Sequence, residues 1–248
     1  MRTPRLRWMI GLALVACHGA PPGPPTPATM LERARQDLHK GDFSAALEAY
    51  KRLAFELQAN DPAQPEVHYY QAECQYQTGD YIEAAHAFRE TADRFPTSEF
   101  APLALLRAGD ANMRLWRRPE LDATYGQTAL ATFQELAARY PDSEAAARAN
   151  LHVKKLRAQF AEKAYKNGMF YYRRGAYDSG IIYFKDVIAS YWDTPRAKDA
   201  LLRLADTYHA IGYVEDLRET CTRLRQYYAQ DPAVNHSCPP ADSTATSP

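Results

Sequence analysis

The feature that most constrains this chain is a spacing of small and aromatic residues that recurs along it. The clearest copy consists of Gly79, Ala84, Phe88 and Pro96. A glycine can adopt the positive φ of a tight turn between two helices, and an alanine lets their backbones approach. An aromatic ring then fills the groove between the helices, and a proline ends the second one. This copy therefore predicts a helical hairpin with its turn at Gly79.

Further copies of the spacing predict that the hairpin is repeated. They begin at Gly41 and Gly175, and another copy without the turn glycine covers residues 129–141. A recurring unit of this kind is typical of tetratricopeptide repeats (TPRs), which stack into a solenoid. We therefore predict an all-α, TPR-type helical solenoid of about five helix-turn-helix repeats over residues 30–230. The predicted helix pairs are 28–40 and 44–57, 65–78 and 82–94, 100–115 and 125–140, 143–173 and 178–190, and 196–211 and 214–229.

The third predicted repeat contains an unusually long connection. Residues 116–124 interrupt the helical pattern, because Pro119 has no amide hydrogen and disfavours helix at Arg118. A long connection inside a helical hairpin is either an interaction loop or a solvated insertion. The sequence leaves both interpretations open.

The amino terminus predicts export and lipidation. Three arginines within the first seven residues precede an apolar run over residues 8–16, which is too short to span a bilayer. Residues 1–16 therefore have the pattern of a signal peptide, and residues 14–16 before Cys17 resemble a bacterial lipobox. Cleavage before Cys17 makes this cysteine the lipidated first residue of the mature chain, anchored by its acyl chains. An ordinary signal peptide, cut near Ala16 or Ala20, is the alternative.

The segments at both ends of the repeats are rich in proline. Residues 17–29 are predicted to form an extended tether behind the lipidated cysteine, and residues 231–248 a disordered tail. His18 follows Cys17. In lipoproteins of this kind an aspartate in that place is associated with retention in the inner membrane, so the histidine favours the periplasmic face of the outer membrane.

Composition and motifs exclude several classes of function. The chain has 30 lysines and arginines against 30 aspartates and glutamates and no basic stripe, so nucleic-acid binding is not expected. The seven histidines form no HExxH motif and the four cysteines no CxxC motif, so no metal and no cofactor are expected. Phosphate-binding glycine motifs are missing as well. We therefore expect a protein that is not an enzyme.

Three cysteines remain if Cys17 is lipidated. Cys74 and Cys221 fall on predicted helices where small apolar residues are needed, which favours buried free thiols. Cys238 lies in the proline-rich tail. It could pair with Cys221 in an oxidising compartment, but we do not favour this pairing.

The first helices of the repeats carry the candidate binding residues. In a TPR stack these helices line a concave surface, and residues not needed for packing face the ligand. Two tyrosines seven residues apart recur in register there, and tyrosine suits an extended peptide because its ring loses little entropy on binding. The alternative is that these tyrosines stack on neighbouring helices. The residues concerned are Tyr69, Glu73 and Tyr76 in repeat two, and Tyr165, Met169 and Tyr172 in repeat four.

Two segments resemble a known family. The first covers residues 119–143, with the interrupted hairpin and its closing Tyr-Pro-Asp-Ser. The second is the string Gly168-x-Phe170-Tyr171-x-x-Arg174-Gly175-Ala176-Tyr177. Together with the lipobox and five repeats they resemble the BamD family, the TPR lipoproteins of the outer-membrane β-barrel assembly machinery. The resemblance covers roughly residues 17–230.

The resemblance implies a scaffold without catalytic activity. Its carboxy-terminal repeats would dock onto the periplasmic POTRA region of BamA, beside other lipoproteins of the machinery. Its amino-terminal repeats would receive targeting segments of unfolded outer-membrane proteins. On this chain the client groove would lie at Tyr69, Glu73 and Tyr76. The BamA-facing residues would be Arg174, Tyr177 and Tyr183.

Some positions depart from the family pattern. Tyr183 stands where the family often has an arginine, Lys163 and Ala164 where it commonly has a His-Glu pair, and Trp192 where it has a proline. A competing function is a periplasmic TPR adaptor of envelope or cell-division coordination, of the Tol–Pal type. Such adaptors usually lack a lipidated cysteine and carry an amino-terminal coiled coil, and no heptad run precedes repeat one here.

Overall fold

The computed structural model describes residues 25–118 and 120–238. Within these ranges the only regular elements are eleven α-helices, which confirms the predicted all-α fold. They are α1 (Pro27–Lys40), α2 (Phe43–Glu56), α3 (Gln64–Thr78), α4 (Tyr81–Arg94), α5 (Phe100–Leu115), α6 (Thr124–Arg139), α7 (Glu144–Tyr172), α8 (Tyr177–Ser190), α9 (Pro195–Ile211), α10 (Val214–Tyr228) and α11 (Pro232–Ser237).

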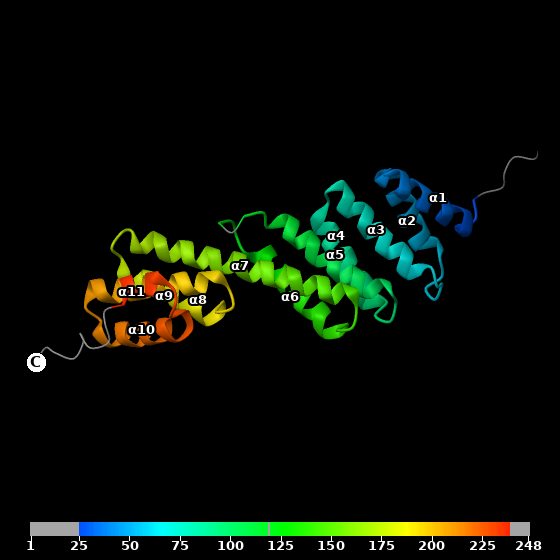
Figure 1. Ribbon diagram of the computed structural model, residues 1–248. Helices are drawn as coiled ribbons and strands as arrows, with labels where there is room; N and C mark the ends of the chain where they lie inside the picture. Colours follow the sequence, from blue (N-terminus) through cyan, green and yellow to red (C-terminus); the bar gives the residue numbers. More distant parts are fainter. Residues whose placement is uncertain (1–24, 119, 239–248) are drawn as a thin grey trace, which may run out of the picture.

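The helices stack in chain order into an elongated molecule (Figure 1). Helix α1 lies at one end and α9, α10 and α11 lie at the other, with α7 running between the two halves. Each helix packs on the next one in the chain, and α3, α5, α7 and α9 also contact the first helix of the neighbouring repeat. Hairpins that pack only on their neighbours are the arrangement of a TPR solenoid.

The predicted turn glycines end their helices as expected. Gly41, Gly79 and Gly175 have φ values of 81°, 94° and 72°, and Gly212 adds a fourth at 77°. In this left-handed conformation the amide of Gly79 donates back to Tyr76 and satisfies a carbonyl at the end of α3. The left-handed turn therefore closes the hairpins α1–α2, α3–α4, α7–α8 and α9–α10.

Pairs of small and aromatic residues form the core between helices. Phe88, Phe133 and Phe184, on the second helices of repeats two to four, are fully buried. A Cβ added to Gly109 would overlap the ring of Phe133, and the ring of Phe184 lies 2.6 Å from the position of a Cβ on Gly168. The aromatic ring therefore fills the space left by a missing side chain on the facing helix, a consequence of the close packing of protein interiors.

Helix α7 belongs to two hydrophobic cores. Its 29 residues begin at Glu144, and the preceding Ser143 caps the helix because its hydroxyl accepts the amide of Ala146. Leu156 is part of a core shared with α3 to α6, and Ala161 and Ala164 are part of a core shared with α8 to α11. One continuous helix thus holds the two halves of the solenoid together.

The connection before α6 packs onto the middle of α7. Trp116 is 4% exposed and stacks on Phe160 with ring centroids 4.6 Å apart. Lys163 donates to the carbonyl of Leu121 at 2.8 Å, and Lys166 lies 2.6 Å from Glu120. The segment is therefore anchored rather than a simple solvated insertion, although Pro119 lies outside the described residues.

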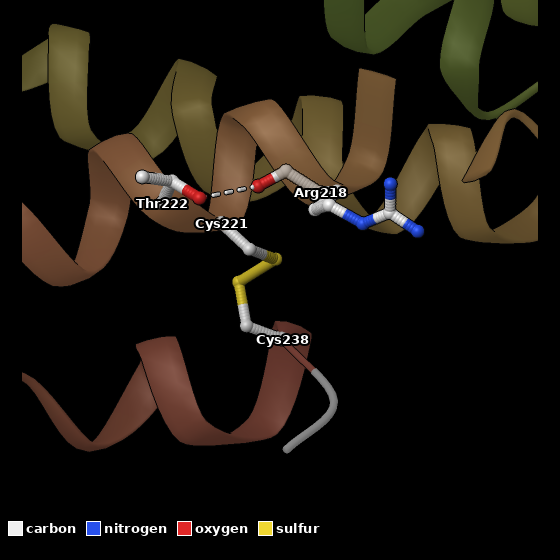
Figure 2. Close-up of a disulfide and its surroundings, with 4 residues drawn as sticks. All are labelled: Arg218, Cys221, Thr222 and Cys238. Carbon is white, nitrogen blue, oxygen red and sulfur yellow. Dashed lines mark hydrogen bonds between the residues drawn. A yellow bond between two sulfur atoms is a disulfide. The ribbon is translucent and has the colours of Figure 1, made fainter. Parts of the chain in front are cut away.

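The carboxy-terminal tail differs from the expectation. Residues 232–237 form α11, and Cys238 pairs with Cys221, so neither the predicted disorder of this part nor the predicted free thiol of Cys221 is correct (Figure 2). Pro232 is the first residue of the helix, where its missing amide hydrogen does no harm, and Asp231 caps it by accepting the amide of Ala233. Cys74 is a buried free cysteine, as predicted.

The amino-terminal tether is shorter than expected. Thr26 caps α1, so residues 27–29 are helical rather than extended. The signal peptide, Cys17 and the tail beyond Cys238 lie outside the described residues. None of the described helices combines the length and the apolar character that a membrane-spanning helix needs.

Candidate functional site

The first helices of the repeats, α1, α3, α5, α7 and α9, form a surface that we call the first-helix face. Polar contacts join each of these helices to the next. They are Arg35–Glu66 between α1 and α3, Glu73–Arg107 between α3 and α5, Asp110–His152 between α5 and α7, Glu162–Arg196 between α7 and α9, and Lys198–Asp231 between α9 and the cap of α11. Much of the polar chemistry on this face therefore holds the repeats together.

Glu73 and Tyr76 belong to this set of contacts. The carboxylate of Glu73 accepts two hydrogen bonds from Arg107, whose guanidinium lies 3.8 Å from the centre of the Tyr76 ring. Arg114 Nε donates to the Tyr76 hydroxyl at 3.0 Å. Tyr76 is only 8% exposed. Both side chains are thus occupied by α5 instead of standing free for a ligand.

Tyr69 also lies on α3, and its ring packs against aromatic residues of α4 and α5. Its ring centre is 5.5 Å from that of Phe88 and 5.3 Å from that of Phe100. Burial raises the pKa of the Tyr69 hydroxyl to about 12. The alternative that the repeat-two tyrosines stack on neighbouring helices therefore describes the structure, while client binding by Tyr69, Glu73 and Tyr76 stays a prediction.

The corresponding residues of repeat four separate into two places. Tyr165 and Met169 line a groove of about 630 Å³ between α7 and α9. Tyr172 faces α8 instead, with its ring edge toward Tyr177 and Phe184 at 5.8 and 6.5 Å. Only part of the predicted repeat-four set is therefore available to a ligand.

The three residues predicted to face BamA lie on the α7–α8 hairpin but not on one surface. Arg174 is exposed, and its guanidinium lies 3.6 Å from the ring centre of Phe170. Tyr171 meets Phe170 edge to face at 5.2 Å and stacks on Tyr183 at 5.6 Å with an interplanar angle of 9°. These contacts connect Arg174 to Tyr183 through what we call the aromatic row, Phe170, Tyr171 and Tyr183.

Tyr177, by contrast, packs on Tyr172, away from this row. Phe170 and Tyr171 belong to the string that resembles the BamD family, but the resemblance does not assign them to a site. The helical spacing of Phe170 and Arg174, four residues apart, is the signal that could have linked them.

No group of three or more His, Cys, Asp or Glu side chains in the described ranges is arranged to hold a metal ion. The partly buried carboxyl of Asp110 lies inside the first-helix face. Desolvation raises its pKa, and His152 and Arg107 act in the opposite direction. His152 is itself fixed by stacking on Phe133, with ring centroids 4.8 Å apart.

Residues 25–224 match the profile of a protein family described as YfiO, outer membrane lipoprotein. The chain belongs to the YfiO family. A curated relative of this chain is the outer membrane protein assembly factor BamD of Caulobacter vibrioides, which is 32% identical over 97 residues. Those residues are 39% of this chain and 32% of that protein, so the aligned stretch spans about a third of the relative's length. The resemblance to the BamD family is thereby confirmed.

Solved TPR structures resemble the YfiO chain only loosely. A tetratricopeptide repeat protein from Parabacteroides merdae is 14% identical with a TM-score of 0.38, over 85% of this chain and 70% of that one. A thermophilic TPR protein from Thermus thermophilus is 21% identical with a TM-score of 0.39, over 84% and 95%. Scores this low carry no argument about function.

Proposed function

We propose that this YfiO-family protein is a lipoprotein scaffold of the outer-membrane β-barrel assembly machinery. It is anchored through acylated Cys17 at the periplasmic face of the outer membrane and holds BamA, other lipoproteins of the machinery and unfolded outer-membrane proteins. The observation that carries the proposal is the match of residues 25–224 to a family of outer membrane lipoproteins. The work of such a scaffold is binding, so we expect no catalysis.

The disulfide supports an exported protein. Cys221 and Cys238 are 5.6 Å apart at their Cα atoms and both side chains are buried. Disulfides persist in the bacterial periplasm and are rare in the reducing cytosol. Pairing of Cys221 with Cys238 therefore fits a chain that passes through an oxidising compartment.

The aromatic row supports a BamA contact on the α7–α8 hairpin. Phe170 is 49% exposed, and Ile182 beside Tyr183 is 68% exposed. Aromatic residues and arginine are the types that dominate binding energy at interfaces. Since Tyr183 replaces a frequent arginine of the family, we propose that the contact is made by stacking at Tyr183 while Arg174 supplies the charge.

The client contact is proposed at α3, near Tyr69, Glu73 and Tyr76. Arg107 and Arg114 cover the Tyr76 ring and hydroxyl, so a client must either displace them or bind across them. Gln77 is exposed next to Tyr76, and a probe there removes the hydrogen bond from Gln77 to Glu73 but keeps the contacts of Tyr76 with Arg107 and Arg114.

Site-specific photocrosslinking in the native envelope tests both proposals. A photoreactive group at Ile182 is expected to capture BamA, and one at Gln77 to capture unfolded outer-membrane proteins. Phe55, which is 90% exposed on α2, is the matched control. Recovery of the free lipoprotein alone, or of cell-division proteins of the Tol–Pal type at Ile182, would contradict the assembly function. Mass spectrometry of the amino-terminal peptide tests the acylation of Cys17 separately.

A further inference from the structure

The groove between α7 and α9 shares only Phe170 and Arg174 with the proposed BamA and client contacts. Its volume of about 630 Å³ lies within the roughly 300–1,000 Å³ that is usual for ligand sites. Five cationic side chains, three aromatic or apolar ones and a single carboxylate surround it. They are Lys166, Arg173, Arg174, Arg196 and Arg203, then Tyr165, Met169 and Phe170, and Glu162.

Three of the five cations already have carboxylate partners. These pairs are Lys166 with Glu120 and Glu162, Arg196 with Glu162 and Asp199, and Arg203 with Asp206. Arg173 and Arg174 are exposed at the end of α7, and neither has an ion-pair partner within the described residues. The free positive charge of the groove is therefore concentrated on two adjacent arginines.

Two arginines of the groove lie over aromatic rings. The guanidinium carbon of Arg174 lies 3.6 Å from the ring centre of Phe170, and that of Arg196 lies 4.7 Å from the ring centre of Tyr165. A stacked guanidinium keeps its N–H groups in the plane parallel to the ring, where they can donate to a carboxylate in bidentate fashion. Arg174 also donates to the Phe170 carbonyl at 3.3 Å, which restrains it in this position.

We propose that this groove binds an acidic linear segment of a partner protein that carries an aromatic side chain beside its carboxylates. The carboxylates would pair with Arg173 and Arg174, and the aromatic side chain would lie against Met169 and Phe170. A phosphate-bearing ligand such as a lipid headgroup would satisfy the arginines but leave the apolar side chains without a partner. The inference rests on one part of the proposed function, namely that this protein binds other proteins.

A direct binding measurement tests this occupant with the full chain. The probe is a fluorescent ten-residue peptide of glutamate and serine with two phenylalanines, followed by fluorescence anisotropy at low salt. The double variant R173A/R174A is expected to weaken binding at least about tenfold, since hydrogen bonds to charged groups are the strong ones. Binding is also expected to weaken as salt screens the charges.

The matched control is K154A/K155A, which removes the same charge from two exposed residues of the same helix. Unchanged binding in this variant supports the site, whereas an equal loss in both variants shows a non-specific charge effect and overturns it. A peptide with serine in place of phenylalanine is expected to bind more weakly, and equal binding overturns the mixed chemistry. If the chain binds phosphatidylglycerol vesicles but not the peptide, and R173A/R174A abolishes the vesicle binding, the groove binds lipid and the proposal is overturned. Because the probe contains no BamA sequence, these outcomes are independent of the crosslinking result.

Discussion

A tyrosine on the first helix of a repeat can face a ligand or a neighbouring helix, and the side chains opposite its ring decide between these two roles. For Tyr76 the opposite helix is α5, whose Arg107 covers the ring and whose Arg114 donates to the hydroxyl. Both arginines lie in the next repeat, and Arg114 is 38 residues away from Tyr76 in the chain. Periodicity within one helix therefore places Tyr76 on the right face but cannot show that the face is already occupied.

Gly168 offers a residue-scale test of the core. A Cβ there would lie 2.6 Å from the ring of Phe184, and overpacking of this kind costs about 1–3 kcal/mol, partly offset by the ~1 kcal/mol gain in helix propensity. We expect Gly168→Ala to lower the free energy of unfolding by about 1 kcal/mol in denaturant titrations. In a G168A/F184L double variant the loss should be smaller than the sum of the two single losses.

The control for this prediction is Gly180→Ala on α8. The atom nearest to a Cβ added at Gly180 is the carbonyl oxygen of Gly168, at 3.4 Å, which is an ordinary van der Waals contact. The higher helix propensity of alanine should therefore dominate, and the free energy of unfolding should stay equal or rise. Equal losses at Gly168 and Gly180 would contradict the packing argument.

The pH dependence of stability tests the burial of Asp110. Because the pKa of Asp110 is raised in the fold, folding is favoured below the pKa of the unfolded carboxyl, about 3.9, and this contribution is lost as pH rises through the folded pKa. Asp110→Asn should therefore gain stability relative to the parent chain as pH rises above about 4. Chemical denaturation at a series of pH values measures the difference.

Asp193 should show the opposite trend. Hydrogen bonds from Arg157 lower the pKa of Asp193, so its contribution is present above the unfolded pKa and is lost as pH falls through the folded pKa. Asp193→Asn is expected to be less stable than the parent near neutral pH, with a difference that shrinks in acid. Parallel pH profiles for the two variants would sink both assignments.

At the scale of elements, α11 shows how a proline can be misread. The proline-rich sequence predicts disorder from residue 231 onward, but Asp231 caps a short helix that begins at Pro232. Helix α11 contacts α9 and α10, where Val234 is 1% exposed and Asp231 lies 2.6 Å from Lys198. A six-residue helix is too short to be stable alone, so the tertiary contacts and the Cys221–Cys238 bond hold it.

Removing the disulfide tests this dependence. The loop that it closes has a sequence separation of 17, for which loop-closure entropy predicts about 3 kcal/mol of stabilisation. We expect C221S/C238S to lower the stability of the carboxy-terminal half and to speed hydrogen exchange in α11 and α10. Reductant should reproduce the effect in the parent chain and do nothing further to the variant. Unchanged exchange in α11 would mean that packing alone holds the helix.

In the molecule as a whole, α7 is the helix that contributes to both hydrophobic cores and so joins them into one solenoid. Its first half packs with α5 and α6, its second half with α8 and α9, and Trp116 stacks on Phe160 where the two halves meet. No hairpin of the described solenoid other than α7–α8 has a first helix of comparable length. The relative position of the proposed client and BamA surfaces therefore depends on the continuity of α7.

Breaking α7 should uncouple the halves. A proline inside a helix costs about 3 kcal/mol and removes a backbone hydrogen bond, so Ala158→Pro is expected to turn one unfolding transition into two. Far-ultraviolet circular dichroism and tryptophan fluorescence, which includes buried Trp116, should then give different midpoints. Lys154→Ala, on the same helix, should leave the two midpoints coincident. Coincident midpoints in A158P would show that the cores do not need a continuous α7.

The repeat architecture follows from patterns that are local in the chain. Turn glycines such as Gly79, small residues such as Ala84 and aromatic residues such as Phe88 act over a few turns of helix, and their effects are local, so spacing alone is enough to predict them. The family resemblance likewise rested on short strings around Arg174 and on the interrupted hairpin. Both depend on residues that are close in the chain.

Which of these residues have side-chain partners depends on the packing of the repeats against one another. Glu73 is held by Arg107, Tyr183 by Tyr171, and Cys221 by Cys238, while Arg173 and Arg174 keep their charges open beside a groove. The physical reason is that ion pairs, ring stacking and burial depend on distance in space. Stacking of repeats brings together side chains that no periodicity within one helix relates.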